Sequence, residues 1–394
     1  MLQILKRIPG VSRVNSACKS RLQEHRAYRN LHYCRELAKK RGIQAPHGAA
    51  LQQALKERLV SRSWNRGWPK RKGDLHIFLA YYVSNWESVL PKSLAPFGKV
   101  TAFNWAEHGF CEREQGWLRE RDRMNALMLE SFYHANREQP VDAVVGYLSG
   151  NTVAPEILLG MSGAGAATFN FCFDDKLHWP GRMAGGRFTS PAAIAHAVDL
   201  NLTNAPESVI KYAAHGGLAL FWPEAACSDV HKPHDIPFEF DVSFVGSCYG
   251  WRPQFIHKLK SHGIRVECFG KGWPNGPLSD EEMVKLYSRS RINLGFGGIG
   301  YSWNLRCLKG RDFEVPMSGG LYLTQYNPEL DLISAVGKEI VTYTSAVDCA
   351  EKINSLLADP HRAKMIRDAG RIRALRSHTY QTRWEEAFSV AGLI

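Results

Sequence analysis

The chain has 394 residues, 44% of them hydrophobic and 22% charged, which is typical of a globular protein long enough for two domains. Its nine cysteines are scattered without a C-x-x-C pair, a pattern that argues against a disulfide framework and a structural zinc site. The net charge of +12 is concentrated in residues 1–73, where 18 lysines and arginines face three glutamates and leave −3 for the rest of the chain.

Residues 1–73 are predicted to form a basic helical extension, with helices over 18–41 and 49–61 followed by Trp64 and Trp68. Three roles are open: packing on the protein body, contact with an anionic membrane surface through basic residues and tryptophans, or contact with another polyanion. Nucleic acid is disfavoured because no nucleic-acid-binding motif is present. No apolar run is long enough to span a bilayer and no signal peptide is evident, so we expect a cytoplasmic location, with peripheral binding at the inner membrane face as the membrane alternative.

Residues 74–230 alternate short apolar runs with helical patterns, which predicts an α/β domain with a parallel sheet. The clearest predicted helix covers 115–135. The predicted strands cover 75–82, 100–105, 143–148, 167–173 and 200–203.

A second domain of the same kind is predicted over 231–394, after a linker at 231–237 that is rich in proline and histidine. It ends in a helical stretch from 348 to about 390. Its predicted strands cover 240–245, 265–269, 291–294, 321–324 and 339–343.

Three loops of the second domain follow predicted strands, at 246–252, 270–274 and 295–300, and carry glycines and cations. In a parallel sheet such loops share the carboxyl edge, where ligands bind. The third loop is predicted to lead into a helix that ends near Gly319. Glycines and cations suit a diphosphate, so we predict donor-binding residues Arg252, Lys271, Gly272, Gly297, Gly298, Arg306, Lys309, Arg311, Glu314 and Gly319. The alternative for the cations after residue 300 is a solvated helix face.

The segments Asn304-Leu305-Arg306, Arg311-Asp312-Phe313-Glu314-Val315-Pro316 and Ser318-Gly319-Gly320 resemble the C-terminal signature of CgeB-like, spore-maturation-type glycosyltransferases. The resemblance implies a GT-B architecture, two Rossmann-like domains with the donor in the cleft between them. It also implies that Glu314 contacts the ribose hydroxyls of the donor, although an ion pair with Arg311 is the structural alternative. Retaining enzymes of a related family carry a second glutamate where this chain has Arg306, so the stereochemical course stays open.

Other nucleotide-binding signatures are missing. The chain has no G-x-G-x-x-G after the strand at 75–82 and no Walker motif, which argues against a dehydrogenase or an ATPase. It also has no D-x-D pair, so cations are expected to take the place of a metal at the diphosphate. We therefore expect no metal and no cofactor beyond a nucleotide-diphosphate sugar as co-substrate.

The first domain is expected to bind the acceptor. Asp174 and Asp175 end a predicted strand and are candidates for a catalytic base, although either could cap a helix or pair with Lys176. The predicted function is hexosyl transfer to an envelope glycan, lipid or protein. The alternatives are a nucleotide-sugar epimerase or hydrolase on the same fold, and a degenerate protein that binds glycans or polyanions. The sugar, base, acceptor and oligomeric state cannot be read from the sequence.

Overall fold

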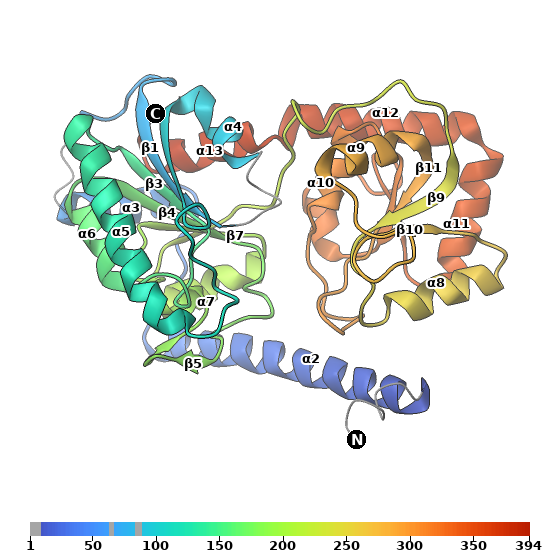
Figure 1. The fold of residues 1–394 in the computed structure, drawn as a ribbon, viewed down its shortest axis with the longest axis horizontal. Helices are drawn as coiled ribbons and strands as arrows, with labels where there is room; N and C mark the ends of the chain where they lie inside the picture. The colour runs from blue at the N-terminus through green and yellow to red at the C-terminus, as the bar shows by residue number, and fades with distance from the viewer. Residues whose placement is uncertain (1–8, 63–66, 83–88) are drawn as a thin grey trace. The chain divides into compact units, whose positions relative to one another are not determined.

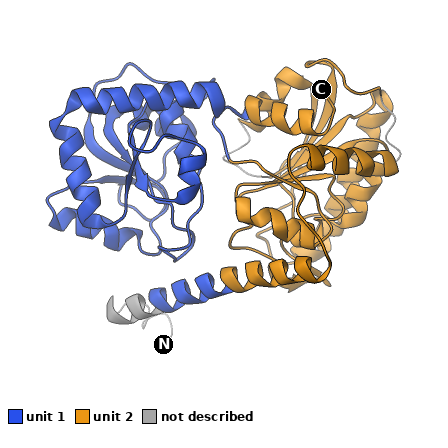
Figure 2. Ribbon diagram, turned by 180° about the vertical axis from the view of Figure 1, so that it is seen from behind, with its two compact units in different colours: residues 1–26, 224–380 blue, residues 27–223, 381–394 orange. Residues whose placement is uncertain are grey.

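The computed structural model describes residues 9–62, 67–82 and 89–394, so Trp64 lies outside the described residues. The chain divides into two compact units (Figure 2). The first domain comprises residues 27–223 and 381–394, and the second domain comprises residues 1–26 and 224–380.

This division differs from the predicted one at both ends of the chain. The second domain begins again at Glu224, before the predicted linker, and the C-terminal residues 381–394 belong to the first domain. Residues 1–73 do not form a body of their own. Helix α2 (Pro9–Lys40) contributes its first part to the second domain and its remainder to the first.

The first domain is built on a parallel sheet of strand order β2-β1-β3-β4-β7-β8 (Figure 1). Its strands are β1 (Leu75–Tyr81), β2 (Gly98–Asn104), β3 (Ala143–Gly146), β4 (Ala167–Cys172), β7 (Leu200–Thr203) and β8 (Ala219–Phe221), with a small hairpin of β5 (Met183–Ala184) and β6 (Arg187–Phe188). Its helices are α3 (Ala49–Ser61), α4 (Leu90–Leu94), α5 (Trp117–Glu138), α6 (Pro155–Gly163), α7 (Val209–Ala214) and α13 (Tyr380–Val390), and short 3-10 turns cover Ala95–Phe97, Pro191–Ala193 and Pro206–Ser208.

Strand β1 lies inside this sheet between β2 and β3, and all of its residues are buried. A strand covered on both faces reads as a continuous apolar run, as this one does apart from His76. The His76 ring is satisfied by the Gln139 carbonyl at 2.7 Å and the Thr101 hydroxyl at 2.8 Å. Helix α5 packs against β1 and β2 with its apolar face, which includes Met128 and Phe132.

The C-terminal helix α13 joins the first domain because its aromatic side chains complete that core. The Trp384 indole donates a hydrogen bond to the Ser93 hydroxyl at 3.0 Å, and the Phe388 ring lies 5.2 Å from Phe97 and 5.3 Å from Phe169 between centroids. Both side chains on α13 are fully buried. The spacing of these two aromatic residues along the helix can be read from the sequence, but the domain that they pack against cannot.

The second domain is built on a parallel sheet of strand order β10-β9-β11-β12-β13. Its strands are β9 (Phe240–Val245), β10 (Glu267–Phe269), β11 (Ser290–Leu294), β12 (Tyr322–Gln325) and β13 (Val341–Tyr343). Its helices are α8 (Arg252–Ser261), α9 (Asp280–Arg289), α10 (Arg311–Met317), α11 (Ala346–Ala358) and α12 (Pro360–Ser377), with a 3-10 turn at Pro328–Leu332. Apolar residues of α8, α11 and α12 form one core with this sheet.

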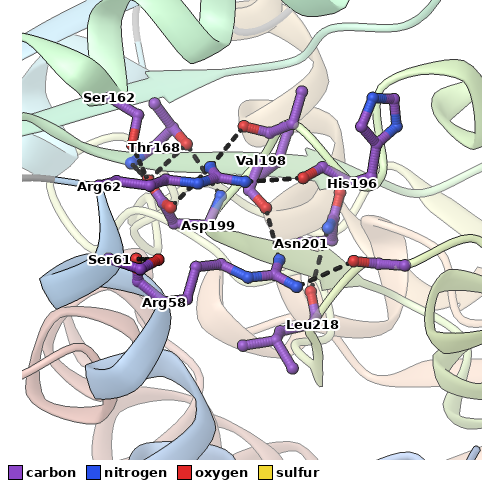
Figure 3. A network of polar contacts seen from close by, with 12 residues as sticks. Arg58, Ser61, Arg62, Ser162, Thr168, His196, Val198, Asp199, Asn201 and Leu218 are labelled. Atoms are coloured by element: carbon purple, nitrogen blue, oxygen red, sulfur yellow. Dashed lines mark hydrogen bonds and ion pairs between the residues drawn. The ribbon is translucent and has the colours of Figure 1, made fainter.

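Part of the basic extension is anchored in the first domain rather than solvated. Helix α3 buries Leu51, Leu55 and Leu59. The Arg62 guanidinium donates to a carboxylate oxygen of Asp199 at 2.8 Å and to two backbone carbonyls, and Arg58 donates to two further carbonyls (Figure 3). These bonds satisfy carbonyl groups of the loops that precede β7 and β8.

The end of the extension is held in the same way. The Trp68 indole donates to Asp142 at 2.9 Å, and the Lys70 ammonium lies 2.7 Å from the same carboxylate. Trp68 and Lys70 therefore have structural partners in the first domain. No helix among the described residues is both long enough and apolar enough to cross a bilayer.

The Arg62–Asp199 contact yields a stability prediction. Asp199 is 1% exposed and also accepts bonds from Ser162 and Thr168, so Arg62→Ala leaves a buried carboxylate without its cation. We expect a loss of about 2–4 kcal/mol in the free energy of unfolding, measured by urea denaturation. Lys56→Ala, at an exposed position of helix α3, which Arg62 follows directly, is the matched control. Equal urea midpoints for the two variants would show that the extension does not stabilise the first domain.

Candidate functional site

The three predicted loops of the second domain come together at the carboxyl edge of its sheet. The Trp273 indole, in the loop after β10, donates to the Gly246 carbonyl after β9 at 2.8 Å. The Trp251 indole, at the end of the first loop, donates to the Ser302 carbonyl beyond the third at 3.0 Å. Two tryptophans thus tie the loops into one surface at the edge where parallel sheets bind ligands.

Gly246 marks the centre of this surface. Its φ of +151° and the space around it both exclude a side chain, because a Cβ atom here would lie 2.9 Å from the Phe244 ring. The same point lies 3.5 Å from Nη1 of Arg252 and 3.5 Å from Nη1 of Arg311. Two guanidinium groups therefore converge on the backbone of Gly246.

Arg252, the first residue of α8, is 5% exposed. Its Nη1 donates to the Ser247 carbonyl at 3.1 Å, and its guanidinium lies over the Tyr249 ring at 4.3 Å. Burial lowers the pKa of Arg252 to about 10, and the positive charge of Arg311 contributes to the same shift. A bound anion would relieve both effects.

Arg311 begins helix α10, and its guanidinium reaches the same point beside Gly246. Its buried Nε has no hydrogen-bond partner among the described residues. Within the part of the chain that the structure describes, neither Arg311 nor Arg252 forms an ion pair with a carboxylate. A buried cation beside a half-buried one that has an unused buried donor is a site that an anion would complete.

Helix α10 is shorter than the predicted helix, and this corrects two expected positions. Arg306 and Lys309 precede the helix, because Ser302 accepts bonds from the backbone N–H groups of Asn304 and Leu305 and so holds a turn there. The predicted helix therefore does not carry these two cations. The Arg306 guanidinium donates to two backbone carbonyls, at 3.2 and 2.9 Å, and so supports the loops.

Asp312, which the sequence did not single out as a site residue, organises the start of α10. One carboxylate oxygen accepts from the Lys309 backbone N–H at 2.7 Å, and the other accepts from the Tyr322 hydroxyl at 2.8 Å. Burial raises the pKa of Asp312 to about 6. This carboxylate fixes the segment that carries Lys309 and Arg311.

Glu314 is half-buried on the next part of α10 and makes no ion pair with Arg311 among the described residues. A Cβ atom on Gly310 would lie 2.8 Å from Oε1 of Glu314 and 2.9 Å from Oε2 of Glu224. Burial, followed by the charge of Glu314, raises the pKa of Tyr287 well above its ordinary value. The structure therefore adds Glu224 to the predicted site, a residue that carries no motif in the sequence.

The remaining predicted donor residues lie in the loops with different roles. Lys271 and Gly272 are exposed after β10, and Gly297 lies beside the backbone of β12. The Gly298 N–H donates to the Gln325 side chain at 3.0 Å. Gly319, with a φ of +73°, ends helix α10, which is a structural role in the chain turn.

The two predicted catalytic aspartates of the first domain lie in contrasting surroundings after β4. Asp174 is exposed and accepts a hydrogen bond from the Tyr147 hydroxyl at 3.3 Å. Asp175 is 1% exposed and accepts from the Tyr212 hydroxyl at 2.9 Å, and burial raises its pKa. Of the two carboxylates, only that of Asp174 is accessible to a substrate in this structure. Lys176 forms an ion pair with Glu207 at 2.8 Å.

The structure describes no group of three or more His, Cys, Asp or Glu side chains arranged to hold a metal ion among its described residues.

Two comparisons with known protein sequences were informative in different ways. Residues 252–389 match a family model described as glycosyl transferase-like. A comparison with curated protein sequences found no match.

The fold is similar to those of several solved structures at low sequence identity. Anabaena Alr3699/HepE in complex with UDP and glucose has 12% identity and a TM-score of 0.55, covering 80% of this chain and 100% of that one. Sucrose-phosphate synthase from Thermosynechococcus elongatus has 11% identity and a TM-score of 0.53, covering 80% and 98%. A glycosyltransferase from Rickettsia africae has 11% identity and a TM-score of 0.52, covering 81% and 98%.

These likenesses establish the fold as GT-B, with two Rossmann-like domains, which confirms the predicted fold class. The family match lies in the second domain and the residues that follow it, where the converging arginines are found. The chain thus has the GT-B fold, and its residues 252–389 are similar to glycosyl transferases.

Proposed function

We propose that the chain is a CgeB-like, metal-independent glycosyltransferase that transfers a sugar from a nucleotide-diphosphate sugar. The observation that carries this proposal is the convergence of Arg252 and Arg311 on Gly246 without an ion-paired carboxylate. A diphosphate supplies the missing negative charge. The Anabaena structure that holds UDP and glucose supports this choice of donor class.

The two arginines would act on the leaving group. As the bond to the sugar breaks, negative charge grows on the diphosphate, and guanidinium groups that are already in place stabilise it without reorganisation. Lys271 lies in the loop after β10, and Lys309 lies in the segment just before α10. Both would add positive charge near the diphosphate. Arg306 contributes indirectly because its guanidinium is bound to the backbone of the neighbouring loop.

Glu314 would bind the ribose of the donor. A carboxylate accepts hydrogen bonds from two vicinal hydroxyls with strong directionality. Its position beside Glu224 at Gly310 places two carboxylates together, which suits a hydroxyl-bearing group better than a second phosphate.

The acceptor would bind to the first domain, with Asp174 as the exposed carboxylate available to accept its proton. An envelope glycan, lipid or protein is the proposed acceptor. A nucleotide-sugar epimerase or hydrolase would turn over the donor without any acceptor. A degenerate binding protein would retain nucleotide affinity without turnover.

An anionic membrane surface is a further proposed partner, through helix α2. Its outward side chains include Leu22, Tyr28 and Tyr33, which are 68%, 62% and 60% exposed, together with exposed arginines. Exposed apolar groups among basic residues are typical of helices that lie on anionic lipid. Trp68 and Lys70 have structural partners in the first domain, so this proposal rests on α2.

The role of Arg311 can be tested by nucleotide binding. Arg311→Gln should weaken UDP, GDP or dTDP binding, whichever the wild type prefers, by about 2–5 kcal/mol, because a desolvated charged contact to the diphosphate is lost. Isothermal titration calorimetry gives the dissociation constants. Lys260→Gln, which removes one exposed charge at the far end of α8, is the matched control and should bind as the wild type does. A wild-type protein that binds no nucleoside diphosphate would contradict the proposed function.

The role of Glu314 can be separated from a general loss of affinity by changing the ligand. Glu314→Gln should weaken binding of the ribonucleotide roughly tenfold or more and leave binding of its 2′,3′-dideoxy analogue unchanged, because only the ribonucleotide offers the hydroxyls. Glu281→Gln, an exposed glutamate on α9, is the control. An equal loss for both nucleotides would assign Glu314 a structural role.

Membrane binding can be tested by sedimentation with liposomes. The full-length protein should pellet with anionic liposomes at low salt and be released as ionic strength rises, because screening weakens the attraction. The double variant Arg26→Gln/Arg29→Gln should pellet less, because each charge removed weakens the free energy of membrane binding by about 1 kcal/mol. The control Lys258→Gln/Lys260→Gln carries the same net charge elsewhere. A protein that stays in the supernatant at low salt rules the membrane partner out.

A further inference from the structure

A cavity of about 400 Å³ lies in the first domain, outside the residues considered so far. Its walls come from segments that follow three strands of the sheet in the chain: residues between Glu112 and Arg119 after β2, Asn151 after β3, and Arg182 and Ala184 after β4. In parallel sheets the carboxyl edge is where ligands bind. The cavity belongs entirely to the first domain.

A hydrogen-bonded chain holds the polar floor of the cavity. The Trp117 indole donates to the Asn151 carbonyl at 2.7 Å, and the Asn151 side-chain amide donates to Oε2 of Glu112 at 3.2 Å. Burial raises the pKa of Glu112, which has no ion pair among the described residues. One oxygen of this half-buried carboxylate is therefore fixed by the protein, while the other has capacity for a ligand hydroxyl.

Three arginines line the same cavity as this carboxylate. The side chains of Arg113, Arg119 and Arg182 line the cavity and are exposed, and within the described part of the chain none of them is held by a hydrogen bond or an ion pair. Their guanidinium groups can donate in pairs to a carboxylate or a phosphate. The cavity thus combines an acceptor for sugar hydroxyls with donors for an anionic group.

We propose that this cavity binds the acceptor of the transfer reaction, and that this acceptor is an anionic glycan whose sugars carry carboxylate or phosphate groups. The assignment rests on the proposed glycosyl transfer, because only that reaction needs an acceptor. Glu112 receives a hydroxyl of the glycan, and Arg119 and Arg182 bind its negative substituent. The volume is large enough for a few sugar-sized groups, as is usual for small-molecule sites.

The test uses the full-length protein and an array of oligosaccharides arranged in matched triplets: a neutral oligosaccharide, its uronic-acid counterpart and its 6-phosphorylated counterpart. Charged members should be bound at least about tenfold more tightly than their neutral partners, with the preference reduced by salt. Preference for the uronic acid or for the phosphate identifies the source of the charge.

Variants locate the binding site. Arg119→Gln/Arg182→Gln should remove the preference for charged members and leave binding of neutral ones unchanged. Arg137→Gln, in the last turn of the same helix as Arg119, is the control and should behave as the wild type does. Glu112→Gln should weaken neutral and charged members alike, because it affects hydroxyl recognition.

Two results would overturn the assignment: equal or absent binding across all triplets, or a charge preference that the double variant retains. UDP affinity is measured on the same samples. A protein that binds nucleotide but shows no charge preference disproves the anionic acceptor alone, whereas a protein that binds no nucleotide disproves the proposed function itself.

Discussion

The second domain depends on one unusual electrostatic arrangement, the two guanidinium groups that meet at Gly246. Burying Arg252 beside a second cation costs free energy, and the lowered pKa of Arg252, caused by burial and then by the charge of Arg311, reflects this cost. The pKa of Arg311 is instead raised, because neighbouring tyrosines and the carboxylates of Glu314 and Asp312 outweigh its burial. Aromatic rings around the pair, including Phe244 and Tyr249, offset part of it through cation–π contacts. An anion between the guanidinium groups removes the remaining penalty, so the arrangement is suited to a ligand with a diphosphate.

The surrounding structure keeps these charges in place before a ligand arrives. Asp312 ties the start of α10 to Tyr322 on β12, and Trp251 and Trp273 tie the loops to one another. Catalysis by electrostatic stabilisation needs such preorganisation. If the charges had to move during the reaction, the free energy of reorganisation would cancel much of the stabilisation that they give. Glu314, which we propose binds the ribose hydroxyls, lies on the same short helix as Arg311.

The sequence predicted the sheets well because buried parallel strands leave continuous apolar runs, as in residues 75–81 and 240–245. It missed β8, which has only three residues and is partly exposed. It also placed 381–394 in the other domain. These residues belong to the first domain because Trp384 bonds to Ser93, and no local sequence pattern indicates such a long-range contact.

Prediction of the site was less complete for a related reason. Arg252 and Arg311 were predicted as donor-binding residues from glycine loops at strand ends, and the structure brings their guanidinium groups together at Gly246. The structural role of Arg306 could not be predicted from the sequence, because its carbonyl partners include that of Tyr326, which is distant in sequence. The burial of Asp175 beside Tyr212 was equally hidden. Glu112 and Glu224 carry no motif, and only the folded chain shows what lies next to them.

The central claim, that the paired arginines bind the diphosphate of the donor, is tested most directly by a crystal structure of the protein with the nucleoside diphosphate that it binds most tightly. The account predicts phosphate oxygens at about 3 Å from the guanidinium nitrogens of Arg311, in reach of Arg252 and beside Gly246. A nucleotide bound with its phosphates on other residues, and the Arg252–Arg311 pair unchanged, would contradict it.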